Sequence, residues 1–194
     1  MTKTIVLASN NAGKLKEFGE MLGAIGFTLH PQGAFNVLEA EEPHPTFIEN
    51  ALAKARHAAA ITGLPALADD SGVCVNALGG APGVLSARYG GEPKSDAANN
   101  CKLLIDLAPH ADKSAYYYCA LVYLRHAHDP QPIIAEGRWD GEIIATPRGA
   151  GGFGYDPHFW LAGLGKTVAE LRSKQKNALS HRGQALRALV EKLQ

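Results

Sequence analysis

Hydrophobic positions in the first half of the chain alternate between short runs of strand length and longer segments of helical period. Residues 4–8 form an apolar run, and in residues 15–25 apolar side chains recur at spacings of three and four. Helices are also predicted for residues 46–63, which begin with threonine and glutamate at capping-box spacing, and for residues 95–107, which begin with serine as N-cap. Strand and helix therefore alternate here.

The middle of the chain has the pattern of strands. Residues 65–68 form a buried-strand candidate, and residues 73–78 alternate as a further strand. Residues 115–125 are rich in Tyr, Val and Leu, which favours a long strand. Residues 133–144 are expected to form two strands about a turn at Asp140-Gly141. Together these elements predict an α/β fold around a mixed sheet.

Length, charge and cysteine content restrict the class of protein. With 194 residues, the chain can bury a substantial core, and residues 1–194 are expected to form a single domain. A formal net charge of zero gives no global field to attract nucleic acid or an anionic membrane. The three cysteines include no CxxC pair, which argues against a disulfide framework or a zinc site. The apolar run after Lys3 is too short for a signal sequence or membrane span, so a cytoplasmic protein is expected.

The loop after the first predicted strand is a candidate phosphate site. Residues 9–14 read Ser-Asn-Asn-Ala-Gly-Lys and lead into a predicted helix, where backbone amides and the helix N-terminus can bind phosphate. The loop is not a Walker A motif, because Ala8 stands where that motif needs glycine and Leu15 where it needs serine or threonine. An ordinary polar turn is the alternative.

Two adjacent carboxylates, Asp69 and Asp70, follow the predicted strand at residues 65–68. Neighbouring strand residues face opposite sides, so only one of the two is expected to point into a site. Their mutual repulsion needs a cation or hydrogen bonds to offset it. Mg²⁺ commonly binds one or two carboxylates together with substrate phosphates, and Glu41 or Glu42 could supply the second carboxylate. A turn-forming or helix-capping aspartate pair is the alternative.

Residues 149–157 are dense in glycine and also carry Phe153, Tyr155 and Asp156. Glycine lets the backbone approach a planar ligand closely and adopt positive φ values. Phe153 can stack on a base, and Asp156 can accept hydrogen bonds from ring N–H groups. A glycine-rich hairpin loop with core aromatics is the alternative.

Basic residues cluster in the helical region predicted for residues 176–193. Side chains three or four positions apart share a helix face, so Lys176, Ser180 and Gly183 are expected on one side, with His181 and Arg182 adjoining. The three cations Lys176, His181 and Arg182 are therefore expected close together. All three can donate a hydrogen bond to a carbonyl oxygen, and Lys176 can also serve a phosphate. Lys54, in the predicted helix at residues 46–63, is spaced to reach a phosphate as well. Solvated basic residues are the alternative in both places.

In this order, the motifs closely resemble the non-canonical purine nucleoside triphosphate pyrophosphatases, also called inosine/xanthosine triphosphate pyrophosphatases. The matching blocks are Leu7-Ala-Ser9-Asn-Asn11-Ala-Gly13-Lys14, Thr46-Phe-Ile-Glu49-Asn50-Ala51, Ala68-Asp69-Asp70-Ser71-Gly72, Leu78-Gly-Gly-Ala-Pro82-Gly83, Ser86-Ala-Arg88-Tyr89, Gly151-Gly-Phe153-Gly-Tyr155-Asp156-Pro157 and Ser180-His181-Arg182-Gly183. Each block is weak alone, but the ordered set spans nearly the whole chain and is highly specific. Asn10 departs from the glycine usual in bacterial members, and residues 43–45, Pro-His-Pro, are an unusual insertion.

The resemblance implies Mg²⁺-dependent hydrolysis of ITP, dITP and XTP to the monophosphate and pyrophosphate, which would cleanse the nucleotide pool. It also implies an elongated two-lobed fold with the nucleotide in a cleft, usually as a homodimer. Asp70 would be general base and metal ligand, Glu41 a second metal ligand, and Asp69 and Lys54 further catalytic residues. The residues implied to bind the substrate are Ser9, Asn10, Asn11, Ala12, Gly13, Lys14, Ser71, Phe153, Gly154, Tyr155, Asp156, Lys176, His181 and Arg182.

Two other functions are also compatible with parts of this residue set. A house-cleaning pyrophosphatase for other modified nucleotides would share an α/β cleft and lysines but should lack the Ser180-His181-Arg182 block. A non-catalytic purine nucleotide sensor would keep Phe153 and Arg182 but would not need Asp70. The presence of both acidic residues favours an enzyme, with a purine nucleoside triphosphate as its partner and no nucleic acid or membrane.

Overall fold

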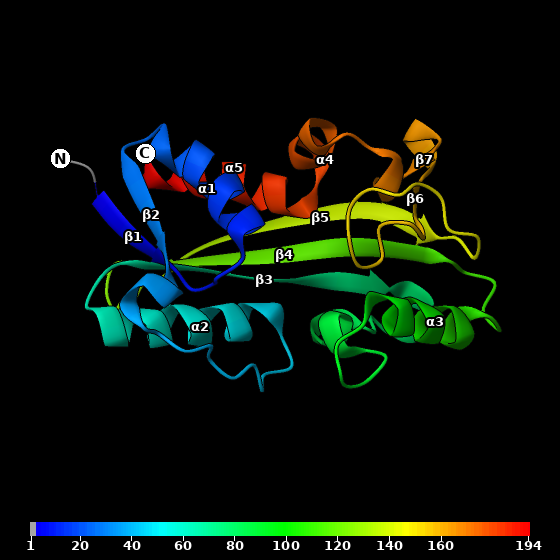
Figure 1. Cartoon of the computed structure of the whole chain (residues 1–194), viewed down its shortest axis with the longest axis horizontal. Helices are drawn as coiled ribbons and strands as arrows, with labels where there is room; N and C mark the ends of the chain where they lie inside the picture. The colour runs from blue at the N-terminus through cyan, green and yellow to red at the C-terminus, as the bar shows by residue number, and fades with distance from the viewer. Residues whose placement is uncertain (1–2) are drawn as a thin grey trace. The chain divides into compact units, whose positions relative to one another are not determined.

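The computed structural model describes residues 3–194 and shows helices packed on a mixed β-sheet (Figure 1). In these residues the sheet has seven strands in the order β2-β1-β3-β4-β5-β6-β7. The strands are β1 (Lys3–Leu7), β2 (Phe27–Pro31), β3 (Ala66–Val75), β4 (Ser114–Leu124), β5 (Ile133–Ile143), β6 (Phe159–Leu161) and β7 (Lys166–Thr167). β1 pairs in parallel with β2 and β3, whereas β6 pairs antiparallel with β5 and β7. The predicted α/β class with a mixed sheet is confirmed.

The α-helices are α1 (Ala12–Gly23), α2 (Phe47–Thr62), α3 (Asp96–Leu107), α4 (Ser173–Leu179) and α5 (His181–Leu193). Thr46 and Ser95 cap α2 and α3 as predicted, and Asn11, which was not predicted as a cap, caps α1. The side chains of Asn11, Thr46 and Ser95 each accept a hydrogen bond from a backbone N–H in the first turn that follows. Gly63 ends α2 in the left-handed conformation, as a C-terminal glycine commonly does. None of the helices within residues 3–194 is both long and apolar enough to span a bilayer.

Short 3₁₀ helices complete the elements. They are η1 (Gln32–Phe35), η2 (Asn76–Leu78), η3 (Gly83–Arg88), η4 (Ala162–Leu164) and η5 (Val168–Glu170). The chain divides into two compact units, of which unit 1 consists of the residues up to Asp70, residues 119–137 and residues 182–194. Unit 2 consists of residues 71–118 and 138–181. Strands β3, β4 and β5 each contribute residues to both units.

Unit 1 has helices on both faces of its strands (Figure 1). On one face, Phe18 and Leu22 of α1 and Leu186 of α5 pack into a core with Ile5 and Leu121. On the other face, four buried alanines of α2 pack against small and branched residues of β1, β3 and β4. Alanine adds little side-chain bulk, so α2 can approach the sheet closely.

Unit 2 has a separate core beneath α3. Leu103 and Leu107 of this helix pack with Val73 of β3, Tyr117 of β4 and Phe159 of β6. The aromatic rings of Tyr117 and Phe159 lie with their centroids 4.4 Å apart. This cluster supports the glycine-rich segment 149–157, because Tyr155 belongs to the same buried set.

Three sequence predictions about these elements were wrong. The predicted strands at residues 65–68 and 73–78 are one strand, β3, which continues through Asp69 and Asp70. The predicted turn at Asp140-Gly141 lies inside the continuous strand β5. Gly141 is needed there for packing, since a Cβ would lie 2.4 Å from the Phe159 ring and 2.6 Å from the Trp160 carbonyl oxygen.

The third error concerns the C-terminal region, where residues 176–193 were expected to share one helical segment. Ser180 has an extended backbone with ψ of 156° and separates α4 from α5. Lys176 and Arg182 therefore lie on different helices and in different units. β2, at Phe27–Pro31, was not predicted at all, although its parallel pairing with β1 forms the edge of the sheet.

Candidate functional site

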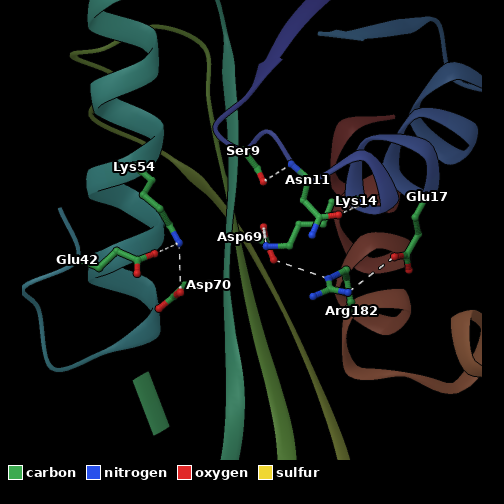
Figure 2. A network of polar contacts seen from close by, with 9 residues as sticks. All are labelled: Ser9, Asn11, Lys14, Glu17, Glu42, Lys54, Asp69, Asp70 and Arg182. Atoms are coloured by element: carbon green, nitrogen blue, oxygen red, sulfur yellow. Dashed lines mark hydrogen bonds and ion pairs between the residues drawn. The ribbon is translucent and has the colours of Figure 1, made fainter. Parts of the chain in front are cut away.

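Asp69 is a buried anion held by two cations on one side of β3 (Figure 2). Its Oδ1 lies 2.8 Å from Nζ of Lys14, and its Oδ2 lies 3.7 Å from Nε of Arg182. Burial by itself would raise the pKa of Asp69, but the charges of Lys14 and Arg182 outweigh it and lower the pKa to about 2. Asp69 is therefore ionised at neutral pH and fixes the position of Lys14.

Asp70 points to the other side of β3, toward α2 (Figure 2). Its Oδ1 lies 3.2 Å from Nζ of Lys54, and its Oδ2 accepts a hydrogen bond of 3.4 Å from Asn50. Lys54 also contacts Oε1 of Glu42 at 2.6 Å, so one ammonium group lies between two carboxylates. Burial raises the pKa of Asp70 despite the opposing effect of Lys54, and Glu42 raises it further. This makes Asp70 a stronger proton acceptor than an ordinary aspartate.

The pKa of Lys54 is raised as well. Burial alone would lower it, but Asp70, Asp69 and Glu42 stabilise the ammonium form more strongly. Lys54 therefore stays protonated, and its charge is available to phosphate oxygens beside Asp70.

The segment before α2 brings Glu42, and not Glu41, to this group. The buried side chain of Asn50 exchanges two hydrogen bonds with the backbone of His44, from His44 N–H at 3.0 Å and to His44 O at 3.1 Å. This anchors the inserted Pro-His-Pro at residues 43–45 and turns Glu42 toward Lys54, while Glu41 is exposed. Asn50 belongs to a motif of the sequence analysis, but sequence alone assigned it no role.

The two carboxylates are a suitable donor set for a magnesium ion. No cluster of three or more His, Cys, Asp or Glu residues arranged to hold a metal occurs in residues 3–194. Mg²⁺ does not need such a cluster, because it commonly takes one or two carboxylates and completes its shell with water and phosphate oxygens. Asp70 and Glu42 already attract the same positive charge, that of Lys54.

The predicted phosphate loop, residues 9–14, comprises the end of the turn between β1 and α1 and the first residues of α1. Asn11 caps the helix, accepting from the N–H of Lys14 at 3.0 Å, and Ser9 accepts from the N–H of Asn11 at 3.2 Å. Ala12 and Gly13 open the first turn of α1 and are exposed, as an anion site at a helix N-terminus requires.

Unlike Ser9 and Asn11, Asn10 hydrogen-bonds outside this loop. Its Oδ1 accepts a hydrogen bond of 2.8 Å from the N–H of Gly33 in η1. A Cβ at residue 33 would lie only 2.7 Å from this oxygen, so the glycine is what admits the contact. The asparagine that departs from the family pattern therefore ties the loop to η1.

In unit 2, Asp156 connects the residues expected to recognise a base. Its Oδ2 accepts from the backbone N–H of Phe153 at 3.0 Å and contacts Nζ of Lys176 at 2.5 Å. Its Oδ1 accepts from the phenol of Tyr117 at 3.1 Å. Asp156 is buried, and internal partners use both of its oxygens. The Phe153 ring, by contrast, is 64% exposed, with Nζ of Lys176 at 4.4 Å from its centroid.

Tyr117 also belongs to this group, although the sequence predicts only that it lies in the strand at residues 115–125. Besides its hydrogen bond to Asp156, its ring stacks on that of His181 with centroids 4.8 Å apart and planes at 11°. Burial raises the pKa of Tyr117 well above 10, and the charge of Asp156 adds to the effect, so the phenol keeps its proton. No local signal marks this tyrosine, because its partners lie about 40 and 60 positions away along the chain.

The other predicted substrate residues lie around these two groups. Tyr155 is buried and donates its phenol hydrogen to the Ser86 carbonyl oxygen at 2.8 Å, and Gly154 has a positive φ of 61°. Ser71 follows Asp70 in β3 and is half-buried. Arg182 lies in unit 1 with Asp69 and Glu17, the latter at 3.9 Å (Figure 2). Lys176 and His181 lie in unit 2 with Asp156.

Comparison with known proteins gives full-length matches. The sequence profile of the Ham1 family matches residues 5–192. A protein of Ralstonia nicotianae named dITP/XTP pyrophosphatase is 66% identical over 194 residues, which cover 98% of this chain and 96% of that protein. One from Chromobacterium violaceum with the same name is 62% identical, covering 100% of this chain and 98% of that protein. The solved structure of a HAM1 protein from Coxiella burnetii has a TM-score of 0.96 at 48% identity and covers 99% of this chain and 98% of that one.

Proposed function

The chain belongs to the Ham1 family, and on that basis we propose that it hydrolyses dITP, ITP and XTP to the nucleoside monophosphate and pyrophosphate. Such an enzyme removes deaminated purine nucleotides from the pool of precursors. Relatives named dITP/XTP pyrophosphatase at 60% to 66% identity over nearly their full length support this substrate class.

The observation that carries the proposal is that the ammonium group of Lys54 lies between the carboxylates of Asp70 and Glu42. In the proposed reaction, a carboxylate oxygen of Asp70 accepts the proton of the attacking water. Lys54 and Lys14 donate to phosphate oxygens and stabilise the charge of the leaving pyrophosphate. A carboxylate base beside a fixed ammonium group, that of Lys54, is suited to attack by water on an anionic phosphate.

We propose that Asp70 and Glu42 hold Mg²⁺, with Glu42 in place of the Glu41 expected from the sequence. When bound, the ion withdraws charge from the phosphates and orients them. The exposed N-terminus of α1, with Ser9 to Lys14, binds the remaining phosphate oxygens through backbone N–H groups. Asp69 does not touch substrate in this scheme but holds Lys14 in place.

For the base, we propose stacking on Phe153 and hydrogen bonding of the purine O6 by Lys176, His181 or Arg182. Hypoxanthine and xanthine present an acceptor there, whereas adenine presents an amino donor that would leave the donors of the site unpaired. Such a mismatch of buried polar groups can lower kcat/KM for the wrong base by about 10⁴-fold. Asp156 takes part by holding Phe153 and Lys176, since its own oxygens are used internally.

A homodimer acting in the cytoplasm is part of the same proposal. The supporting argument is the family resemblance, and sedimentation equilibrium of the purified protein would test the oligomeric state.

The decisive experiment measures pyrophosphate and orthophosphate released from dITP, ITP, XTP, GTP and ATP, with Mg²⁺ and with EDTA. We expect metal-dependent pyrophosphate from dITP, ITP and XTP and little from ATP or GTP. Orthophosphate as the first product would contradict attack at the α-phosphorus. Tight binding of a nucleotide without turnover in the presence of Mg²⁺ would support a non-catalytic nucleotide sensor. Equal hydrolysis rates with ATP and ITP would contradict the proposed recognition of O6 by hydrogen-bond donors.

A further inference from the structure

Two side chains of α3, those of Asp96 and Asn100, form hydrogen bonds with the backbone N–H and carbonyl groups of Gly154. Oδ2 of Asp96 accepts a hydrogen bond of 2.7 Å from the N–H of Gly154. Nδ2 of Asn100 donates to the carbonyl oxygen of Gly154 at 2.8 Å and to the carbonyl oxygen of Asp96 at 2.9 Å. The two residues are four positions apart and therefore share one face of the helix.

The orientation of the Asn100 amide follows from these partners. Both are carbonyl oxygens, which only accept, so the nitrogen and not the oxygen of the amide must face them. Gly154 is itself at φ of 61°, a conformation that glycine adopts without strain. The contact therefore requires a donor at residue 100, an acceptor at residue 96 and glycine at residue 154.

The held residue lies directly after Phe153. On its other side, Phe153 is fixed through its own N–H, which donates to Asp156. The backbone on both sides of the phenylalanine is thus hydrogen-bonded, while the ring is 64% exposed. An exposed ring on a fixed backbone is suited to stacking, because less conformational freedom is lost when a planar ligand binds.

We propose that Asp96 and Asn100 are positioning residues for purine recognition, which act by presenting the Phe153 ring to the base. This inference rests on the proposed function, since it concerns the base site of the same reaction. Neither residue needs to touch the substrate. Loss of the contact lets segment 152–156 move and weakens stacking, which acts equally on the bound substrate and the transition state.

The expected effect is on KM and not on kcat. We expect Asn100→Ala to raise KM for dITP about tenfold and to leave kcat within about twofold, because a uniform loss of binding has this signature. Asn100→Asp, which replaces the donor by a carboxylate facing two carbonyl oxygens, should raise KM at least as much.

Asp96→Ala should also raise KM, whereas Asp96→Asn retains an acceptor and should remain close to wild type. Lys102→Ala, which removes a surface ion pair with Asp106 on the same helix, is the control and should change neither constant.

A double-mutant cycle with Phe153→Ala tests whether the contact acts through the ring. If it does, Asn100→Ala raises KM in the wild-type background and has almost no effect in the Phe153→Ala background. Equal effects in both backgrounds, or an unchanged KM in every α3 variant, would overturn the inference. If Asn100→Ala does not fold, the comparison of Asp96→Ala with Asp96→Asn decides in the same way. A wild-type protein that hydrolyses none of the purine substrates would instead refute the proposed function.

Discussion

Asp69 and Asp70 are neighbours in β3, yet their pKa values are shifted in opposite directions. The carboxylate of Asp69 faces Lys14 and Arg182, which lower its pKa to about 2 against the effect of burial. Asp70 faces Lys54 and Glu42, and burial together with the Glu42 charge raises its pKa. Because successive strand residues point to opposite faces, one strand places a permanent anion on one side and a proton acceptor on the other.

The lowered pKa of Asp69 predicts a specific loss of stability in acid. An aspartate with a pKa of 3.8 when unfolded and about 2 when folded stabilises the protein above about pH 4 and loses this contribution as the pH falls to about 2. The contribution at stake is about 2 kcal/mol. In urea unfolding experiments with EDTA at pH 6, 4 and 2.5, the free energy of unfolding should therefore fall more steeply with pH for wild type than for Asp69→Asn. Asp140→Asn, which changes an exposed carboxylate, is the control and should follow wild type.

Asp70→Asn should separate binding from chemistry. Asparagine has the shape of aspartate but cannot accept the proton of water and is a weaker Mg²⁺ ligand, so kcat at saturating Mg²⁺ is expected to fall by about 10² to 10⁴-fold. Binding of dITP, measured by titration calorimetry, should persist because Lys54 and Lys14 remain. A variant that keeps kcat within tenfold of wild type would exclude Asp70 as the general base.

The two glutamates before α2 make a matched pair for the metal site. Glu42 contacts Lys54 at 2.6 Å beside Asp70, whereas Glu41 is exposed. Glu42→Gln is expected to raise the Mg²⁺ concentration for half-maximal activity about tenfold, and Glu41→Gln to leave it unchanged. The reverse result would return the metal site to Glu41.

Tyr117→Phe removes one hydroxyl from the base site and leaves the ring stacked on His181. Oδ1 of Asp156 then loses its hydrogen bond, and the carboxylate that holds Phe153 and Lys176 can shift. We expect KM for dITP to rise severalfold and the free energy of unfolding to fall by about 1–3 kcal/mol, as for other hydrogen bonds to buried charged groups.

Tyr116→Phe is the control for that experiment. It removes a phenol from the same strand, whereas the side-chain hydrogen bonds of Asp156 go to Tyr117, Phe153 and Lys176. A fall in stability without a change of KM in Tyr117→Phe would show that the tyrosine supports only the fold.

Local structure was largely readable from the sequence. Thr46 and Ser95 cap α2 and α3 as predicted, because a side-chain oxygen three residues before a backbone N–H of the first helical turn is a local relationship. The family could be recognised because its motifs recur in a fixed order, whatever their spatial arrangement. The opposite orientation of Asp69 and Asp70 also follows from strand geometry alone, although not which of the two meets which cations.

Only the tertiary structure decided what is assembled from distant segments. Glu42 rather than Glu41 meets Lys54 because Asn50 anchors the intervening chain, and Tyr117 meets Asp156 because β4 passes beneath the glycine-rich segment. The role of Gly141 also depends on tertiary structure: the sequence predicts a turn there, but the glycine instead allows β6 to lie close to β5. Periodicity and capping express the energies of neighbouring residues, whereas these contacts depend on how remote segments pack, which no local pattern encodes.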